Sequence, residues 1–377
     1  MNRLVLLRVL MAGAFVGIGC GGSPGTVGNG GTGGAGAGTG GVMMPAGTGG
    51  TSPGTGGGTG GDQAGTGGAP ADAAPEAGPA DGGSSTVMDP GTEGDGDFMI
   101  ASPFTAAPEM SDKMGVAKGQ VIQFTMATNT TFNDGGRKVG VYVPNGYKSG
   151  TEIPFMVAQD GINPQNGGSF GLDDLRPLFD NLIAAGTMPA VVGIFVDPAG
   201  MRSVEYDTVS EKYYTFVETE LLPAAIAQVK MKANLDLNLT KDPEGRSTFG
   251  GSSGGAAAFT MGWFHPESYR RILTLSGSFV GLQKSAMYPG GAGDYHTLIP
   301  MMPAKPLRVF IEAGSNDLGG GSWKTANDQM SVALKGKMYH YRYVAAQGAT
   351  HEDDRARRQY LPDAMRWLWR GYPITKL

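Results

Sequence analysis

A serine set among glycines, between two apolar segments, constrains the fold of this chain more than any other feature. Residues 246–249 are typical of a short buried strand, residues 249–255 read FGGSSGG, and the alanine-rich run 256–261 indicates the start of a helix. A strand that turns directly into a helix leaves little space for side chains, so glycines flank the serine. The serine is then held in a strained conformation, and the amide of the next residue can stabilise an oxyanion.

The G-x-S-x-G spacing alone is weak evidence, because it also occurs at Ser23 and Ser52 in a glycine tract without strand or helix. Ser253 fits the spacing as well as Ser252 does. We favour Ser252 as the nucleophile, because the glycines at 254–255 are then two and three positions beyond it, where the helix must pack closely against the strand.

The N-terminus predicts export. Residues 1–19 combine two arginines with an apolar run, which is typical of a secretory signal and too short for a functional membrane span. Cys20, the only cysteine, follows directly and resembles the lipidation site of bacterial lipoproteins, although Gly17 replaces the usual leucine. An ordinary signal followed by an incidental cysteine is the alternative. We expect an outer-membrane or cell-surface lipoprotein, held on the membrane through Cys20 and facing the periplasm or the exterior.

Residues 20–100 are rich in glycine, with threonine, alanine, proline and serine, and carry too few apolar side chains to form a core. They predict a disordered tether that leads to one folded domain at residues 101–377. Because the only cysteine lies at the expected anchor, we expect no disulfide, and the domain must rest on its hydrophobic core.

The composition also excludes several classes of partner. The formal net charge is −5, and no cluster of basic residues with interleaved aromatics occurs, which argues against nucleic acid. The chain lacks a Cys/His ligand set, the H-E-x-x-H pattern and the G-x-x-x-x-G-K-[ST] phosphate loop. We therefore expect neither a metal ion nor a cofactor.

Apolar periodicity divides the folded region into alternating strands and helices, which favours an α/β fold with a mostly parallel, doubly wound sheet. Residues 121–127 and 138–144 predict an antiparallel pair at its N-terminal end. The further expected strands are residues 153–159, 190–196, 246–249, 271–275, 307–313 and 339–345, and the expected helices are residues 172–185, 210–229, 256–264, 323–334 and 361–370.

A serine hydroxyl becomes a good nucleophile when a base removes its proton and a carboxylate orients that base. The serine turn resembles the nucleophile elbow of α/β-hydrolases, in which the acid and then the histidine follow the serine, each after a strand. His351 lies just past the last expected strand and is the candidate base, in preference to the other three histidines. Asp317, in the turn after residues 307–313, is the candidate acid, with Glu312 as the alternative.

An oxyanion hole needs two backbone amides aimed at one point. The amide of Ser253 is the first candidate, because it follows the nucleophile. The second is expected in the loop at residues 159–162, after the third strand. Within this loop, Asp160 either binds substrate or braces the turn.

Several segments resemble the esterase family that includes esterase D-like proteins, enterochelin esterases, feruloyl esterases and the mycolyltransferase antigens. The resemblance covers residues 104–372 and is greatest to the enterochelin esterase-like branch. The segments are RSVEYD at 202–207, ETELLP at 218–223, FGGSSGG at 249–255, GSF at 277–279, VFIEAGSNDL at 309–318 and LPDAMRWLW at 361–369.

The resemblance implies that Ser252, which precedes x-Gly-Gly, is the nucleophile, and that Asp317 and His351 complete a catalytic triad. It also implies that the amide of Ile162, which follows an Asp-Gly pair, completes the oxyanion hole. One departure concerns the loop before the base. Related sequences usually carry glycine there, whereas Ala349-Thr350 precede His351 in this chain.

The resemblance implies an ester substrate without identifying it, because the family cleaves siderophore lactones, feruloyl and acetyl sugar esters and S-formylglutathione. Arg202, Glu205, Tyr206 and Trp323 are candidate substrate-binding residues, each with a structural role as the alternative. We expect a serine carboxylic-ester hydrolase that acts through an acyl-enzyme on a small-molecule or glycan ester of siderophore or sugar/aromatic type. An acyltransferase with a sugar or alcohol acceptor, and a hydrolase fold that only binds its ligand, are the alternatives.

Overall fold

The structure is a computed structural model that describes residues 91–162 and 171–374. The predicted signal, Cys20 and the tether up to residue 90 lie outside the described residues. The strands are β1 (Gly96–Ala101), β2 (Gln120–Met126), β3 (Arg137–Val143), β4 (Glu152–Ile153), β5 (Phe155–Gln159), β6 (Val192–Val196), β7 (Asn238–Leu239), β8 (Arg246–Gly251), β9 (Arg271–Leu275), β10 (Arg308–Asn316) and β11 (His340–Thr350). The α-helices are α1 (Leu172–Ala184), α2 (Arg202–Tyr206), α3 (Lys212–Phe216), α4 (Leu222–Ala233), α5 (Ser253–Phe264), α6 (Tyr295–Met301), α7 (Ser322–Gly336) and α8 (Asp354–Leu368).

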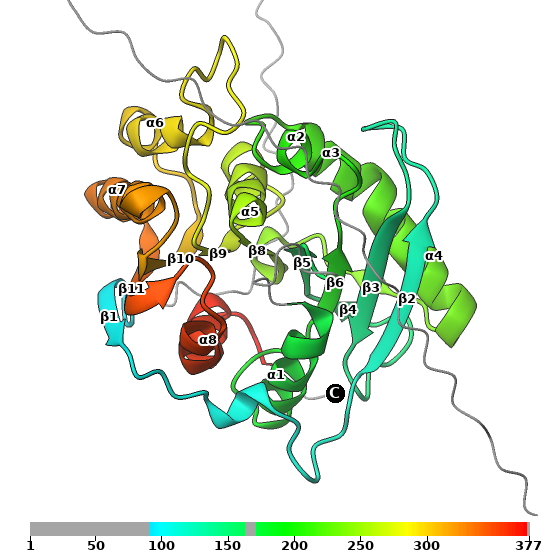
Figure 1. Ribbon diagram of the computed structural model, residues 1–377. Coiled ribbons are helices and arrows are strands. Elements are labelled where there is room, and N and C mark those ends of the chain that lie inside the picture. The colour runs from blue at the N-terminus through cyan, green and yellow to red at the C-terminus, as the bar shows by residue number, and fades with distance from the viewer. Residues whose placement is uncertain (1–90, 163–170, 375–377) are drawn as a thin grey trace, which may run out of the picture. The chain divides into compact units, whose positions relative to one another are not determined.

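The main sheet has nine strands in the order β1-β11-β10-β9-β8-β5-β6-β3-β2 (Figure 1). Neighbouring strands run parallel from β1 to β6, whereas β3 pairs antiparallel with both β6 and β2. The short strands β4 and β7 form a separate parallel pair. This arrangement confirms the predicted α/β class, with a mostly parallel, doubly wound sheet and an antiparallel pair near its start.

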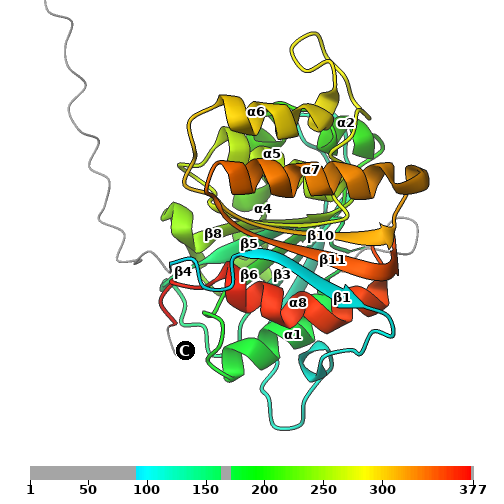
Figure 2. The same cartoon turned by 90° about the vertical axis from the view of Figure 1, so that its left-hand side faces the viewer.

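Helices cover both faces of the sheet. α1 and α8 lie on one face, and α4, α5, α6 and α7 lie on the opposite side (Figure 2). One cluster of buried apolar side chains joins α1 and α8 to the sheet, and two more fill the other side. Every residue of β5, β6 and β9 is buried, which explains the continuous apolar runs that predicted these strands.

At the centre of the sheet, β8 turns sharply into α5. All of β8 is buried, and so is every residue of α5 except Phe264. A Cβ at Gly250 would lie 2.3 Å from the carbonyl carbon of Gly254, and a Cβ at Gly254 would lie 3.0 Å from the Cβ of Gln159. Glycine at these two positions therefore allows the helix to approach the strands closely.

The predicted helix at residues 210–229 is divided in the structure. α3 passes into a π-helical turn, η3 (Val217–Leu221), and α4 follows with Pro223 in its first turn. Proline has no backbone N–H, so it is tolerated at a helix start but interrupts hydrogen bonding within a helix. The change of hydrogen-bond pattern therefore falls directly before the proline.

β1 extends the folded region beyond its predicted start at residue 101. It pairs in parallel with β11 along its whole length. Asp95, just before the strand, accepts a hydrogen bond from the Trp367 indole at 3.0 Å, and Asp97 accepts one from Lys335 at 3.0 Å. The predicted tether boundary at residue 100 is corrected accordingly. The sequence concealed this strand because its pairing partner is the last strand of the chain.

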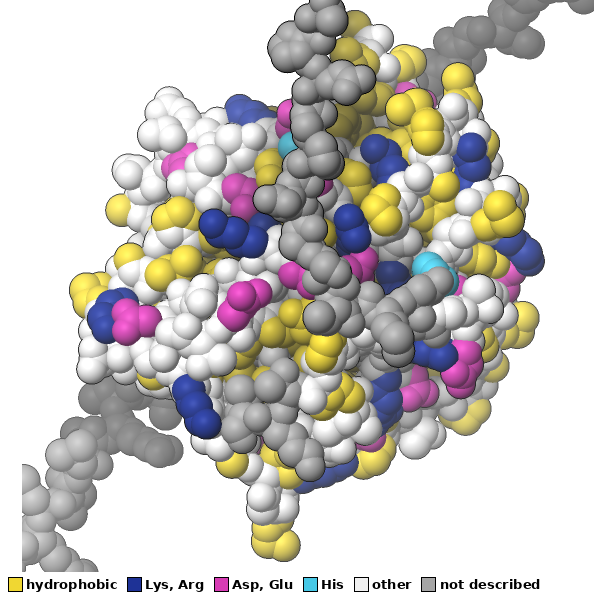
Figure 3. Space-filling view, turned by 180° about the vertical axis from the view of Figure 1, so that it is seen from behind, with side chains coloured by type: hydrophobic (Ala, Val, Ile, Leu, Met, Phe, Trp, Pro, Cys, Tyr) yellow, Lys and Arg dark blue, Asp and Glu magenta, His cyan; other side chains and the backbone are white. Residues whose placement is uncertain are grey.

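The surface carries both signs of charge. Basic and acidic side chains are interspersed on the face seen in Figure 3. Many charged side chains are paired, as Arg366 is with Glu109 at 2.7 Å. Within residues 91–162 and 171–374, none of the helices has the length and apolar character that a bilayer span requires.

Removal of β1 should destabilise the domain. A chain that begins at Ser102 loses the six strand residues of β1 and leaves the edge of β11 unpaired. We expect its free energy of unfolding, measured by urea titration, to be lower by about 2 kcal/mol or more than that of a chain that begins at Gly91. Equal unfolding midpoints for the two chains would show that β1 does not contribute to the stability of the sheet.

Candidate active site

Ser252 lies at the turn between β8 and α5. Its backbone angles are φ 54° and ψ −125°, a strained combination for a residue with a Cβ. The turn is held by neighbouring backbone: the Ser252 N–H donates to the Leu275 carbonyl, and the Ser278 N–H donates to the Ser252 carbonyl, each at 2.9 Å. The side chain is partly exposed at the carboxyl end of the central strand.

Ser252, His351 and Asp317 form a chain of hydrogen bonds. The Nε2 of His351 lies 2.9 Å from the Oγ of Ser252, and its Nδ1 lies 2.5 Å from Oδ1 of Asp317. An ionised carboxylate only accepts hydrogen bonds, so this arrangement assigns the proton to Nδ1 and leaves Nε2 to accept from the serine. The Asp317 side chain is fully buried, and 16% of the His351 side chain is exposed. The arrangement suits a general base held in one tautomer.

Strand pairing explains why two residues so distant in sequence meet at the serine. β10 ends at Asn316 and β11 at Thr350, and these two residues are partners in the parallel ladder. Asp317 and His351 are the residues that follow, so they leave neighbouring strands at the same level. The Ala349-Thr350 pair, which departs from the family pattern, still belongs to β11, so the base follows the strand directly.

The two expected oxyanion donors have different surroundings. Ser253 is the first residue of α5, where a helix leaves backbone N–H groups without acceptors in the helix itself. The N–H of Ile162 instead donates to Oδ1 of Asp197 at 2.8 Å. Asp197 directly follows β6, the strand next to β5. The expectation for Ile162 is therefore corrected. Its N–H, which was expected to bind the oxyanion, donates instead to the carboxylate of Asp197, the residue after β6.

Asp160 braces the elbow. Its carboxylate oxygens accept from Nε and Nη2 of Arg202, at 2.9 Å and 2.6 Å. The Asp160 side chain is fully buried, whereas 27% of the Arg202 side chain is exposed. Burial raises the pKa of Asp160, and its hydrogen bonds to the Arg202 guanidinium oppose that rise. A Cβ at Gly254 would lie 3.2 Å from Oδ2 of Asp160, so the ion pair packs against the first turn of α5.

Glu205 and Tyr206 lie in the core, which corrects their prediction as substrate-binding residues. Glu205 forms an ion pair with Arg137, and neither side chain is exposed. Burial raises the pKa of Glu205, and the bond to Arg137 opposes the rise. Tyr206 is 1% exposed and meets the Tyr213 ring edge to face, with centroids 5.1 Å apart. α2 is too short for its sequence spacing to have revealed which side faces inward.

The structure places Trp323 close to Ser252, together with Ser278, which the sequence did not indicate as a site residue. The Trp323 indole donates to Oγ of Ser278 at 3.0 Å, and this Oγ is 3.4 Å from that of Ser252. The indole also meets the His351 imidazole edge to face, with centroids 6.3 Å apart. Ser278 lies after β9, and only the strand order reveals that β9 is the neighbour of β8.

Two more carboxyl groups lie close to Asp317 and His351. Glu312, the alternative acid, is completely buried within β10, and it is Asp317 that binds His351. Burial raises the pKa of Glu312 to about 8, although the Arg357 guanidinium opposes the rise. Glu352, the residue after His351, is also buried, and one of its carboxylate oxygens lies 3.3 Å from Arg357. Two buried carboxyl groups besides Asp317 therefore lie within β10 and next to His351.

Comparison with known proteins identifies relatives of this chain. The model of the family described as Putative esterase matches residues 131–359. An iron(III) enterobactin esterase from Dickeya dadantii (strain 3937) is 26% identical over 302 residues, which cover 73% of this chain and 63% of that protein. This chain thus spans less than two thirds of the length of that relative.

Solved structures share the fold. An enterobactin esterase from Shigella flexneri, determined in the presence of 2,3-dihydroxy-N-benzoyl-serine, has 20% identity and a TM-score of 0.51, over 68% of this chain and 60% of that one. A ferulic acid esterase from Anaeromyces mucronatus, in complex with ferulic acid, has 15% identity and a TM-score of 0.52, over 73% of this chain and 99% of that one. These likenesses confirm the predicted α/β-hydrolase fold.

Removal of the Glu205 carboxylate should destabilise the domain. The buried Arg137 guanidinium then loses Glu205, its fully buried ion-pair partner. We expect Glu205→Ala to lower the free energy of unfolding by about 3–5 kcal/mol, measured by urea titration. Asp236→Ala, which breaks the exposed pair of Asp236 with Lys230, is the matched control and should change stability little. A stable Glu205→Ala protein with impaired substrate binding would restore the original prediction for Glu205.

Glu312 should make stability depend on pH. Its folded-state pKa, about 8, lies above its ordinary value of 4.5, so the folded protein holds this proton more tightly than the unfolded chain does. Its contribution is therefore complete below pH 4.5 and is lost as the pH rises through about 8. We expect Glu312→Gln to gain stability relative to the parent between pH 5 and pH 9, measured by urea unfolding, by about 1 kcal/mol or more. A constant difference between the two proteins across this range would contradict the shift.

Proposed function

This chain belongs to the Putative esterase family, and we propose that it is a serine carboxylic-ester hydrolase that uses Ser252, His351 and Asp317. The observation that carries the proposal is the chain of hydrogen bonds from Ser252 Oγ through His351 to Asp317. Fold alone would not support it, because one fold can host many activities. The strained conformation of Ser252, at a strand-to-helix turn, adds to this support.

Acylation follows from this geometry. Ser252 Oγ attacks the ester carbonyl carbon while its proton passes to Nε2 of His351, 2.9 Å away. The buried carboxylate of Asp317 stabilises the imidazolium that forms. The carbonyl oxygen becomes an oxyanion that accepts from the Ser253 N–H. His351 then returns the proton to the departing alkoxide, the alcohol leaves, and the acyl group remains on Ser252.

Deacylation repeats these steps with water. His351 accepts a proton from the attacking water, a second tetrahedral intermediate forms, and its collapse breaks the bond to Ser252 Oγ. The proton on His351 returns to Ser252, and the carboxylic acid leaves. An alcohol that attacked in place of water would receive the acyl group by the same route.

We propose a siderophore-type or sugar/aromatic ester as the substrate. The relatives described above are named for enterobactin and for ferulic acid. Hydrolysis of a carboxylic ester, which the names of both relatives specify, is the reaction that the proposed triad would catalyse. The chain spans only 63% of the Dickeya relative, so neither substrate is carried over as established.

Labelling of the full chain by a fluorophosphonate serine probe tests the nucleophile. We expect the parent and Ser253→Ala to be labelled and Ser252→Ala to remain unlabelled, detected by mass spectrometry of the modified peptide. Asp317→Asn should lower kcat on any accepted ester by a factor of about 10⁴, because the imidazole then loses its orienting carboxylate. An unlabelled but folded parent would contradict the hydrolase proposal and favour a binding protein.

We also propose that the enzyme is exported and anchored by lipid at Cys20, on the strength of the signal-like residues 1–19. Growth with a radiolabelled or alkyne-tagged fatty acid should label the parent and not Cys20→Ser. Equal labelling of the two proteins would exclude Cys20 as the modified residue.

A further inference from the structure

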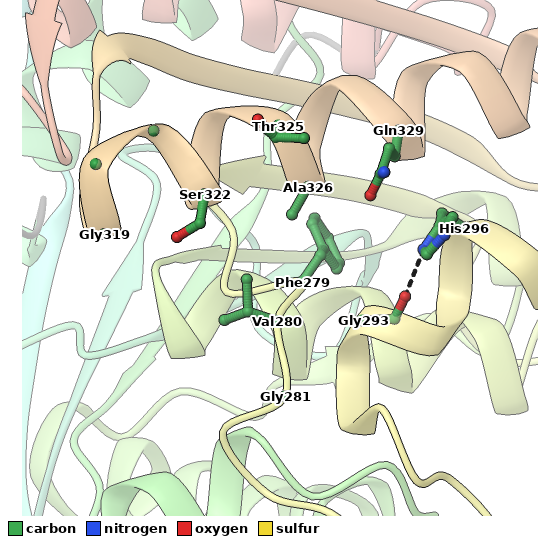
Figure 4. Close-up of a pocket in the computed structure, with 12 residues that line it drawn as sticks. Phe279, Val280, Gly281, Gly293, His296, Gly319, Ser322, Thr325, Ala326 and Gln329 are labelled. Carbon is green, nitrogen blue, oxygen red and sulfur yellow. Dashed lines mark hydrogen bonds between the residues drawn. The ribbon is translucent and has the colours of Figure 1, made fainter. Parts of the chain in front are cut away.

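A cavity of about 500 Å³ lies between α6, α7 and the loop after β9 (Figure 4). It reaches the proposed base only indirectly. A Cβ at Gly319, which lines the cavity, would lie 3.2 Å from the Trp323 ring, and that ring meets His351 edge to face. Ser252, Asp317 and His351 are not among the described residues that line it. The position of the base therefore depends on other contacts, and the residue after it makes several of them.

Glu352 follows the base directly and is buried, with 7% of its side chain exposed. Its N–H donates to Oγ of Ser276 at 3.2 Å, and Ser276 is the residue after β9. Glu352 and Ser276 have φ angles of 49° and 46°, which residues with a Cβ rarely adopt. Such strain persists only where the surrounding structure imposes it, and it is frequent at functional sites. The backbone next to His351 is therefore held in place by the end of β9.

The Glu352 side chain occupies the space beside Gly251, the residue before the nucleophile. A Cβ at Gly251 would lie 1.6 Å from Oε1 of Glu352, and the three nearest atoms outside its chain neighbours all belong to Glu352. Gly251 is not among the described residues with a positive φ, so its backbone conformation does not require glycine. This glycine therefore makes room for Glu352, whereas Gly250 and Gly254 make room for α5.

Arg357, in α8, binds Glu352 through both its side chain and its backbone. Nη1 of Arg357 lies 3.3 Å from Oε1 of Glu352, and Nη2 donates to the Glu352 carbonyl. The Arg357 side chain is 1% exposed, so this pair is shielded from water. Asp353, which caps the start of α8, accepts from the Thr350 N–H at 3.3 Å. The residues before and after His351 are thus both fixed to the start of α8.

We propose that Glu352 is a positioning residue for the base: by joining the loop that carries His351 to β9, to α8 and to Gly251, it holds the imidazole at the nucleophile. The inference rests on the proposed function, because it concerns the base of the acylation step. The Nε2 of His351 and the Oγ of Ser252 lie 2.9 Å apart although they belong to distant segments of the chain. Glu352 is adjacent in sequence to the first of these residues, and its side chain packs against the neighbour of the second. A misplacement of about 1 Å in such a site can cost on the order of 10²-fold in rate.

Substitution of Glu352 should slow the reaction of Ser252 with a serine probe. The rate constant for fluorophosphonate labelling of the full chain is compared between the parent, Glu352→Ala and Glu352→Gln. We expect Glu352→Ala to lower this rate constant about tenfold to a hundredfold, because the loop loses its contacts with Gly251 and Arg357. Glutamine has the length of glutamate and keeps an acceptor oxygen, so Glu352→Gln should stay within about threefold of the parent.

A substitution on the opposite side of the contact provides an independent test. Gly251→Ala should lower the labelling rate about tenfold in the parent, because the new methyl group displaces the Glu352 carboxylate. In the Glu352→Ala background the same change should cost at most about threefold, because the space is then vacant. If Glu352→Ala does not fold, Glu352→Asp takes its place, because its shorter side chain withdraws the carboxylate from Gly251.

Glu244→Ala is the matched control. Glu244 also pairs with a buried arginine, Arg271, at 3.0 Å, but it lies before the amino end of β8, whereas Ser252 follows the carboxyl end of that strand. We expect this variant to lose stability and to keep the parental labelling rate. Thermal unfolding verifies that each variant is folded.

The outcomes separate this proposal from the one it rests on. A folded parent that is not labelled would overturn the hydrolase itself. Labelling of folded Glu352→Ala at the parental rate would overturn the positioning role of Glu352 alone. So would a Glu352→Gln protein as slow as Glu352→Ala, or an equal cost of Gly251→Ala in the two backgrounds.

Discussion

The close approach of α5 to β8 determines the geometry of the residues around Ser252. The helix can begin immediately after the strand only because Gly250 and Gly254 leave space where side chains would collide. The same sharp turn holds Ser252 at a positive φ and places Ser253 at the start of the helix. One packing constraint therefore explains both the partly exposed position of the Ser252 side chain and the position of the proposed oxyanion donor.

The parallel sheet then brings distant segments to that point. β9, β10 and β11 follow β8 in order across the sheet, and their carboxyl ends lie at one edge. The residues that leave these ends are Ser278, Asp317 and His351, one from each strand. Because ladder pairing sets the level at which each strand ends, the hydrogen-bonded chain needs no long connecting loops.

Ion pairs with buried carboxylates hold three of the arginines in this part of the domain. Arg202 is bound to Asp160, Glu205 to Arg137, and Glu352 to Arg357. The guanidinium groups of these pairs are bound to carboxylates, so they are not available to bind an anionic substrate. The cavity between α6, α7 and the loop after β9 is lined by apolar, hydroxyl, amide and imidazole groups, and none of its described lining residues is Asp, Glu, Lys or Arg. The electrostatic character of the site therefore follows from pairing and not from net charge.

The sequence by itself predicted the α/β class and the strand-to-helix turn at Ser252, because such turns and apolar periodicity are local features. It also indicated Asp317 and His351, which the structure joins to Ser252 by hydrogen bonds. It did not reveal β1, because a short glycine-flanked strand becomes recognisable only through its partner β11.

Tertiary structure alone decided which polar residues face one another. In the folded chain Glu205 and Tyr206 are buried in the core, the Ile162 N–H donates to Asp197, and Ser278 lies next to Ser252. These outcomes depend on the order of strands in the sheet and on the side of a short helix that is buried, and neither is encoded within a local segment of the chain.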